Sequence, residues 1–151
     1  MSINEKTFKN NEVLQLLNRI YQEEVSGVNR YLHYSFMITG FNRIPIQKWF
    51  RDNALESLKH AVEIGEKMTS LGGHPTLAAR HIEEINLHTT QQLLEESLAF
   101  EEEAIGFYKN LVAVAENLSD IALTEMARDF VRTEVEHADE VRKMLLNANK
   151  A

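Results

Sequence analysis

The sequence predicts an all-α protein, an antiparallel four-helix bundle with one long crossover between helices 2 and 3. Three observations lead to this prediction. Apolar residues recur at intervals of three and four through four segments of roughly thirty residues, and no segment shows the alternation of a strand. The chain holds only two prolines and six glycines, which leaves room for long helices. Two connections are short, which makes neighbouring helices antiparallel, and the third is long enough to cross the length of the bundle.

The first two helices are bounded by turn residues. The first is expected over about Asn10–Thr39, where Gly40 ends it. Pro45 fits the first position of the second helix, which runs to about Leu71 and stops at a pair of glycines. The segment after that pair has weak periodicity, and we interpret it as the crossover.

The last two helices follow the crossover directly. A third helix is expected over 89–117 or 90–117. Ser119 or Asp120 then caps a fourth helix, which runs to about Asn147. Helices of this length exceed the average of about a dozen residues, so side chains at their midpoints lie far from either end of the bundle.

Composition excludes several classes of function. Acidic residues outnumber basic ones by 23 to 16, and the net charge of −7 argues against a nucleic-acid binder, which needs a basic face. No apolar run approaches the ~20 residues that cross a bilayer, and the first ten residues lack the apolar core of a signal peptide. We therefore expect a cytoplasmic protein with neither nucleic acid nor membrane as a partner. There is no cysteine, so any metal must be held by histidine and carboxylate, which suit iron, manganese or zinc.

Ionisable residues interrupt the apolar stripe of each helix near its middle. They are Glu24, His60, Glu101, Glu134 and His137. Because antiparallel helices of equal length align their midpoints, we expect the five side chains to meet at one level of the core. Each unpaired buried charge costs several kcal/mol, and bound divalent cations remove that cost. The i, i+3 pair of Glu134 and His137 lies on one helix face, where the carboxylate can bridge two ions while the imidazole binds one.

The same stripe selects one residue within each acidic run. Of the run EEE that begins at Glu101, only Glu101 is expected to face the core. Glu24 is expected to face the core rather than Glu23, and Glu134 rather than Glu136. The sequence therefore predicts one cluster of carboxylates and imidazoles that binds a pair of metal ions.

Four segments, one in each helix, carry a resemblance to a known family. They are EVSGVNRYLHY, ESLKHAVEIGEKMTSLGGHP, SLAFEEEAIGFY and RTEVEHADEV. With these segments the sequence resembles the bacterioferritins, within the ferritin-like di-iron superfamily. The resemblance implies a single ferritin-like four-helix-bundle domain over residues 1–151. It also implies a homo-oligomer with a di-iron ferroxidase centre, which oxidises Fe(II) to Fe(III) with O2 or H2O2 for iron storage or detoxification.

The family's ligands are carried over residue by residue, with one departure. Those that match are Glu24, His60, Glu101, Glu134 and His137, which the resemblance implies are both metal ligands and catalytic. The family's second helix carries Glu-x-x-His, whereas here Ser57 stands at the first position. Glu56 lies one place earlier, about 100° round the helix. If a long side chain or a helix bulge brings Glu56 to the metal, it is a sixth ligand; otherwise the site has only three carboxylates.

Two further departures concern haem and assembly. Bacterioferritins bind haem through a methionine at the position of Leu58, so we expect no haem here. Only fourteen residues follow His137, so the family's short fifth helix is expected to be absent. A dimer then becomes an alternative to the 24-subunit cage.

Other interpretations remain beside the ferroxidase. One is a dimeric ferritin-like di-metal protein that reduces peroxide or handles metal without storing it, and another is a structural bundle whose site has decayed at Ser57. Tyr31 and Tyr108 fit either a role beside the metal or core packing, and Trp49 is interpreted as a packing or dimer contact.

Overall fold

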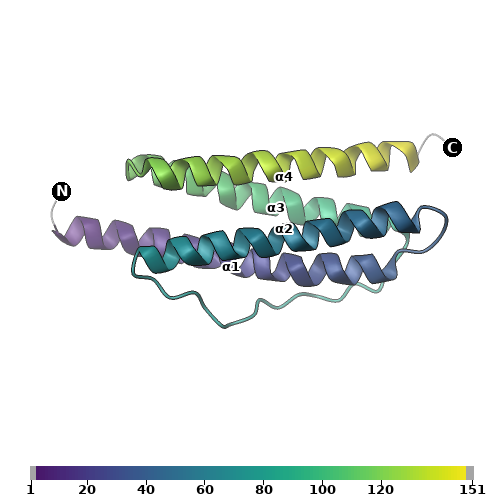
Figure 1. Ribbon diagram of the computed structural model, residues 1–151, viewed down its shortest axis with the longest axis horizontal. Helices are drawn as coiled ribbons and strands as arrows, with labels where there is room; N and C mark the ends of the chain where they lie inside the picture. The colour runs from purple at the N-terminus through teal and green to yellow at the C-terminus, as the bar shows by residue number, and fades with distance from the viewer. Residues whose placement is uncertain (1–2, 149–151) are drawn as a thin grey trace.

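The computed structural model describes residues 3–148 and confirms the predicted fold class. Figure 1 shows long antiparallel helices in two pairs, with α1 (Ile3–Met37) beside α2 (Arg43–Ser70) and α3 (Thr90–Asn117) beside α4 (Ile121–Ala148). The crossover, residues 71–89, runs along the outside of α1 from one end of the bundle to the other. None of the described helices combines the length and the apolarity that a bilayer-spanning helix requires.

Most helix boundaries agree with those expected, and their caps explain them. The side chain of Thr89 accepts the N–H of Gln92 while the Gln92 side chain accepts the N–H of Thr89, which is a capping box at the start of α3. Asp120 Oδ1 accepts the N–H of Leu123 at 2.9 Å and caps α4.

Two expected boundaries in the first half of the chain were wrong. The first helix begins at Ile3 rather than near Asn10, because the helical pattern was too weak in the polar opening segment to extend it. The second begins at Arg43, so Pro45 is its third residue rather than its first. Proline is still tolerated there, because N–H groups in the first turn have no partner within the helix. The expectation about a fifth helix concerns the chain after Ala148, outside the described residues.

Two apolar clusters fill the bundle. They are separated by a polar level, the layer of the core that holds Glu24, His60, Glu101, Glu134 and His137. One lies at the end where α1 begins, and its largest side chains are those of Leu17, Ile20, Ile64, Met68, Tyr108, Leu111 and Phe130. The other lies at the opposite end, around Tyr31, Tyr34, Ile38, Phe50 and Leu93. Along every helix the expected metal ligands fall between these two clusters. The core is therefore interrupted at the level that the sequence predicted.

The crossover is held against α1 by polar contacts that the helical pattern does not reveal. Asn18 Oδ1 accepts the N–H of Thr76 at 3.0 Å, and Gln22 Nε2 donates to the carbonyl of Ala78 at 3.0 Å. Arg80 pairs with Glu23 on α1. As a result Glu23 is only 3% exposed, although the stripe had placed it away from the core. The crossover, and not the bundle axis, buries this carboxylate.

A glycine sets the close approach of α1 and α2 beside the polar level. A Cβ added at Gly27 would lie 2.8 Å from Ser57 Oγ and 3.1 Å from the Phe100 ring. We expect Gly27→Ala to lower the free energy of unfolding by about 1–3 kcal/mol, the usual cost of overpacking. Gly106→Ala is the matched control, because nothing lies within 4 Å of a Cβ there, and this change should stabilise α3 by about 0.5–1 kcal/mol. Urea denaturation of both variants measures the difference; equal stabilities would contradict the close approach.

Candidate metal centre

The structure brings all five predicted ligands together between the two helix pairs. Glu24 comes from α1, His60 from α2, Glu101 from α3, and Glu134 and His137 from α4. The carboxylates of Glu24, Glu101 and Glu134 and the His60 imidazole are buried, and the His137 side chain is 16% exposed. Their neighbours Glu102, Glu103 and Glu136 are exposed, as the stripe predicted.

These side chains form two groups that share one carboxylate. In the first group, His60 Nδ1 lies 3.5 Å from Glu24 Oε1 and 3.2 Å from Glu134 Oε1. In the second, His137 Nδ1 lies 3.6 Å from Glu134 Oε2 and 4.0 Å from Glu101 Oε1. Each group offers three ligand atoms within 4.8 Å of one another. Glu134 thus directs one oxygen to each group, and it would contribute one oxygen to each of two ions if both groups held one.

The remaining candidate, Glu56, lies outside both groups. Its Oε2 is 2.9 Å from His137 Nε2, the ring nitrogen on the opposite side from Nδ1. The side chain is 35% exposed, which places it at the edge of the bundle. Ser57, at the position where the family carries a ligand, is buried with its hydroxyl beside Gly27. The structure therefore brings Glu56 to a predicted ligand but not into either group of ligand atoms.

Burial and neighbouring groups together shift the pKa values of the three carboxylates in opposite directions. Burial raises the pKa of Glu24, and burial together with the nearby Glu134 holds the pKa of Glu101 well above its usual value. Burial acts in the same direction on Glu134, but its neighbours Glu101, His137 and His60 outweigh it and hold the pKa of Glu134 well below its usual value. Glu134 is therefore the carboxylate that carries its charge most readily in the metal-free protein.

The imidazoles hold protons that a metal ion would displace. Burial lowers the pKa of His60, but the carboxylates of Glu134 and Glu24 outweigh it and raise the pKa to about 10. The pKa of His137 is likewise raised, because Glu134 and Glu56 outweigh the effect of burial. Since a metal binds only the deprotonated nitrogen, we infer that binding at this cluster releases protons.

The metal-free protein should lose stability as the pH rises from about 7 to 10. The folded pKa of His60, about 10, exceeds its ordinary value of 6.5, so this group stabilises the fold fully below 6.5 and loses its effect as the pH passes through 10. The raised pKa values of Glu24 and Glu101 act with the same sign. We expect the urea midpoint in a chelating buffer to fall over this range, and to fall less in His60→Gln. A midpoint that stays constant or rises would contradict this assignment.

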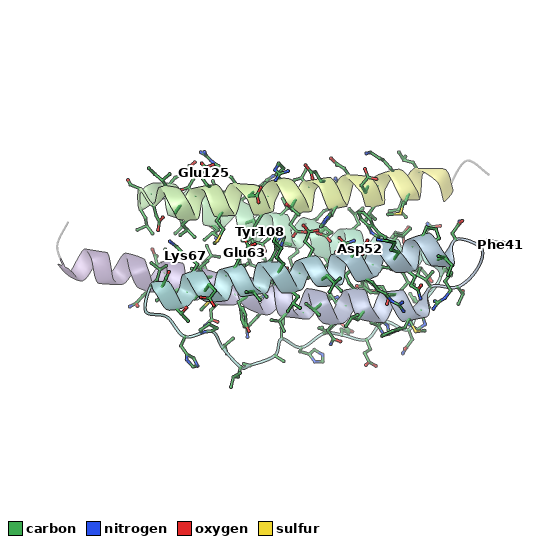
Figure 2. All side chains as sticks on the ribbon, in the orientation of Figure 1. Phe41, Asp52, Glu63, Lys67, Tyr108 and Glu125 are labelled. Carbon is green, nitrogen blue, oxygen red and sulfur yellow. The ribbon has the colours of Figure 1, made fainter. Side chains whose placement is uncertain are left out.

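Aromatic side chains enclose the two groups. The Tyr108 hydroxyl donates a hydrogen bond to Glu24 Oε1, and Figure 2 shows Tyr108 between the helix pairs, well inside the bundle. The Phe130 ring lies 4.4 Å from that of His60, centroid to centroid. Tyr108 therefore acts both in core packing and on a predicted ligand, whereas Tyr31 packs among Tyr34, Phe50 and Phe100.

Trp49 is a neighbour of the site that sequence reasoning did not place there. Its ring is nearly perpendicular to the His137 imidazole, at 81°, with centroids 5.8 Å apart. The available signal was spacing, because Trp49 precedes Glu56 by two helical turns and so lies on the same face of α2. Spacing alone did not show what this face of α2 contacts. The structure shows that it faces His137 of α4.

The fold agrees with comparisons with known proteins. The ferritin-like domain family matches residues 14–151. The chain belongs to the ferritin-like family. The match includes α2, α3, α4 and most of α1, so the resemblance inferred from sequence is confirmed at the level of this family.

Individual ferritin-like proteins match at low identity. Bacterioferritins of Mycobacterium bovis and Mycobacterium tuberculosis are 24% identical over 135 residues, which cover 89% of this chain and 84% of each relative. A nutrient stress-induced DNA-binding protein of Synechococcus is 27% identical over 129 residues, covering 73% of each chain. A crystal structure from Bacillus anthracis, described as ferritin-like, diiron-carboxylate proteins, superposes with a TM-score of 0.86 at 25% identity and covers 96% of this chain and 99% of its own.

Proposed function

We propose that this chain is a bacterioferritin-like iron-binding protein with a di-iron ferroxidase centre. It oxidises Fe(II) with O2 or H2O2 and thereby stores or detoxifies iron. The observation that carries the proposal is the pair of three-residue groups that share Glu134. A carboxylate with one oxygen toward each group is suited to hold two cations side by side, and that is what a two-ion oxidation requires.

The donor set fits iron. Three carboxylates and two imidazoles are ligands that suit iron, manganese or zinc. His60 Nδ1 and Glu101 Oε2 are buried without a hydrogen-bond partner, and a bound cation would supply the partner that such buried atoms need. The relatives named bacterioferritins and the structure described as diiron-carboxylate support iron among these metals.

The electrons balance for either oxidant. Two Fe(II) ions give one electron each, which reduces H2O2 to two waters or O2 to H2O2 with the uptake of two protons. Oxidation raises the charge of each ion by one. The carboxylates of Glu24, Glu101 and Glu134 favour the more highly charged product, because their attraction to it is stronger in a buried site. His60 and His137 complete the two ligand sets, and the Tyr108 hydroxyl orients Glu24.

The test is an anaerobic Fe(II) titration of the metal-free protein followed by the addition of oxygen or peroxide. We expect two irons per chain, and oxidation faster than in buffer alone. Metal content by mass spectrometry and absorbance at ferric wavelengths are recorded on the same sample. Oxidation no faster than in buffer would overturn the ferroxidase proposal, and fewer than two irons per chain would overturn the di-iron centre.

A second candidate function is a ferritin-like di-metal protein that reduces peroxide or handles metal without storing it. Ser57, at the position of an expected ligand, favours it. Light scattering separates the two candidates. A particle near 24 times the chain mass of 17.4 kDa supports storage in a cage, whereas a dimer at twice that mass supports the second candidate.

Self-association is proposed for either candidate. The outer face of α1 and α2 exposes apolar side chains at helical spacing, namely Val25, Leu32, Phe36, Leu55, Leu58 and Val62. Contiguous exposed apolar side chains on a soluble protein commonly mark an interaction surface. Leu58, the position of the haem methionine in bacterioferritins, lies on this face and half-exposed. No role in binding nucleic acid is proposed, because the net charge of −7 disfavours contact with phosphates.

A further inference from the structure

The carboxylate of Glu56 lies beside the outer nitrogen, Nε2, of the candidate ligand His137. His137 presents Nδ1 to the carboxylates, 3.6 Å from Glu134 and 4.0 Å from Glu101, and presents Nε2 to Glu56 at 2.9 Å. The last distance is that of an ordinary N–H···O hydrogen bond. Because the two nitrogens lie on opposite sides of the ring, Glu56 stands behind the imidazole as seen from the cluster. We propose that Glu56 is a positioning residue for His137, and not a replacement for the ligand absent at Ser57.

The chemistry of imidazole explains what such a contact does. A neutral imidazole carries its single proton on one nitrogen, and only the other nitrogen can bind a metal ion. A carboxylate that accepts a hydrogen bond from Nε2–H keeps the proton on that nitrogen and therefore leaves Nδ1 bare toward Glu134 and Glu101. It also makes the imidazole a stronger donor to the metal. This role strengthens a ligand set that lacks one carboxylate.

The contact also joins the two halves of the bundle. α2 packs chiefly on α1, and α4 chiefly on α3, so Glu56 and His137 connect one helix pair to the other. Trp49 lies on the same face of α2, and its ring is nearly perpendicular to the His137 imidazole, with centroids 5.8 Å apart. α2 thus fixes both the protonated nitrogen and the plane of a ligand that α4 supplies.

The two imidazoles of the cluster are supported differently. The His60 ring packs against Phe130, with centroids 4.4 Å apart, and against Tyr108 at 6.3 Å. His137 instead has a carboxylate at its outer nitrogen. Loss of Glu56 should therefore lower the affinity for the ion at His137 and leave the affinity for the ion at His60 unchanged.

Calorimetric titration of the metal-free protein with Zn(II) tests this inference, which rests on the proposed metal centre. We expect wild type to bind two ions. Glu56→Ala should also bind two ions. The more weakly bound of the two should bind roughly 10–100-fold less tightly than in wild type, which is the usual loss when a carboxylate behind a histidine ligand is removed. Glu56→Gln should recover part of the loss, because its amide oxygen still accepts a hydrogen bond from Nε2–H. Glu63→Gln is the control, since Glu63 lies two turns further along α2 and pairs with Lys59 at 3.8 Å.

Proton NMR of the Zn(II)-loaded protein supplies a second measurement. Its signal would not change on mutation if Glu56 had only a structural role. We expect a slowly exchanging Nε2 proton on His137 in wild type, and its loss in Glu56→Ala. Unchanged affinities and an unchanged proton signal would overturn the inference while leaving the metal centre intact. A drop to one bound ion would show that Glu56 is itself a ligand. Failure of wild type to bind any ion would instead overturn the proposed function.

Discussion

Glu134→Gln is expected to abolish tight binding of both metal ions. Glu134 is the one side chain common to both groups of ligand atoms, with Oε1 toward His60 and Oε2 toward His137. Glutamine has nearly the same shape, so the bundle should persist. Its amide nitrogen, however, turns a hydrogen-bond donor toward one of the two ions, and the negative charge is lost. We expect each affinity to fall by more than about 100-fold, the upper range for groups that act on a ligand indirectly.

The measurement is calorimetric titration with Fe(II) under anaerobic conditions, followed by oxidation with added oxygen. Glu136→Gln is the matched control, because Glu136 is exposed on the same helix and pairs with Arg132 at 3.4 Å. It should retain two ions and the wild-type rate. A Glu134→Gln variant that loses only one ion would show that the carboxylate belongs to one group and does not bridge them.

Phe130→Ala should produce the largest loss of stability. The Phe130 side chain is 2% exposed and lies where the apolar cluster at the start of α1 meets the polar level. Its ring centroid is 4.4 Å from that of His60 and 4.9 Å from that of Tyr108. Truncation of a buried phenylalanine costs about 3–5 kcal/mol, through lost burial and the cavity that remains. For a chain of this size the melting temperature should fall by roughly 10 °C.

Thermal unfolding of the metal-free protein measures this effect without the contribution of bound ions. Phe41→Ala is the control, because Phe41 is 108% exposed and lies in the turn at the end of the bundle, where Figure 2 labels it. That change should stay within about 0.5 kcal/mol. A small effect of Phe130→Ala would mean that neighbouring side chains collapse into the space, and that the ring does not support His60.

The sequence predicted that five ionisable side chains gather in the core, because their positions follow from helical periodicity alone. Each of the five expected ligands lies at a position that a regular helix turns toward the bundle axis, and helices of equal length bring those positions to one level. The same rule separated Glu101 from Glu102 and Glu134 from Glu136, as their burial shows. Capping residues placed the start of α3 and α4 for a similarly local reason, since a cap depends on residues within one turn.

Contacts outside regular periodicity could not be predicted in this way. Glu23 is buried because Arg80 of the crossover pairs with it, and the path of an irregular segment is set by distant partners. Glu56 lies off the stripe, and its contact with His137 Nε2 depends on the distance and rotation between α2 and α4. The close approach of Gly27 to Ser57 likewise depends on how α1 packs on α2.

The amino-acid sequence by itself determined the four helices, the side of each helix that faces inward, and the five ionisable residues at the middle of the bundle. It could do so because a helix repeats every 3.6 residues whatever surrounds it. Only the tertiary structure decided that Glu134 directs one oxygen to each group, and that Glu56 meets the outer nitrogen of His137. These contacts join residues on different helices or different atoms of one side chain. Their geometry is fixed by packing between helices, which no local pattern encodes.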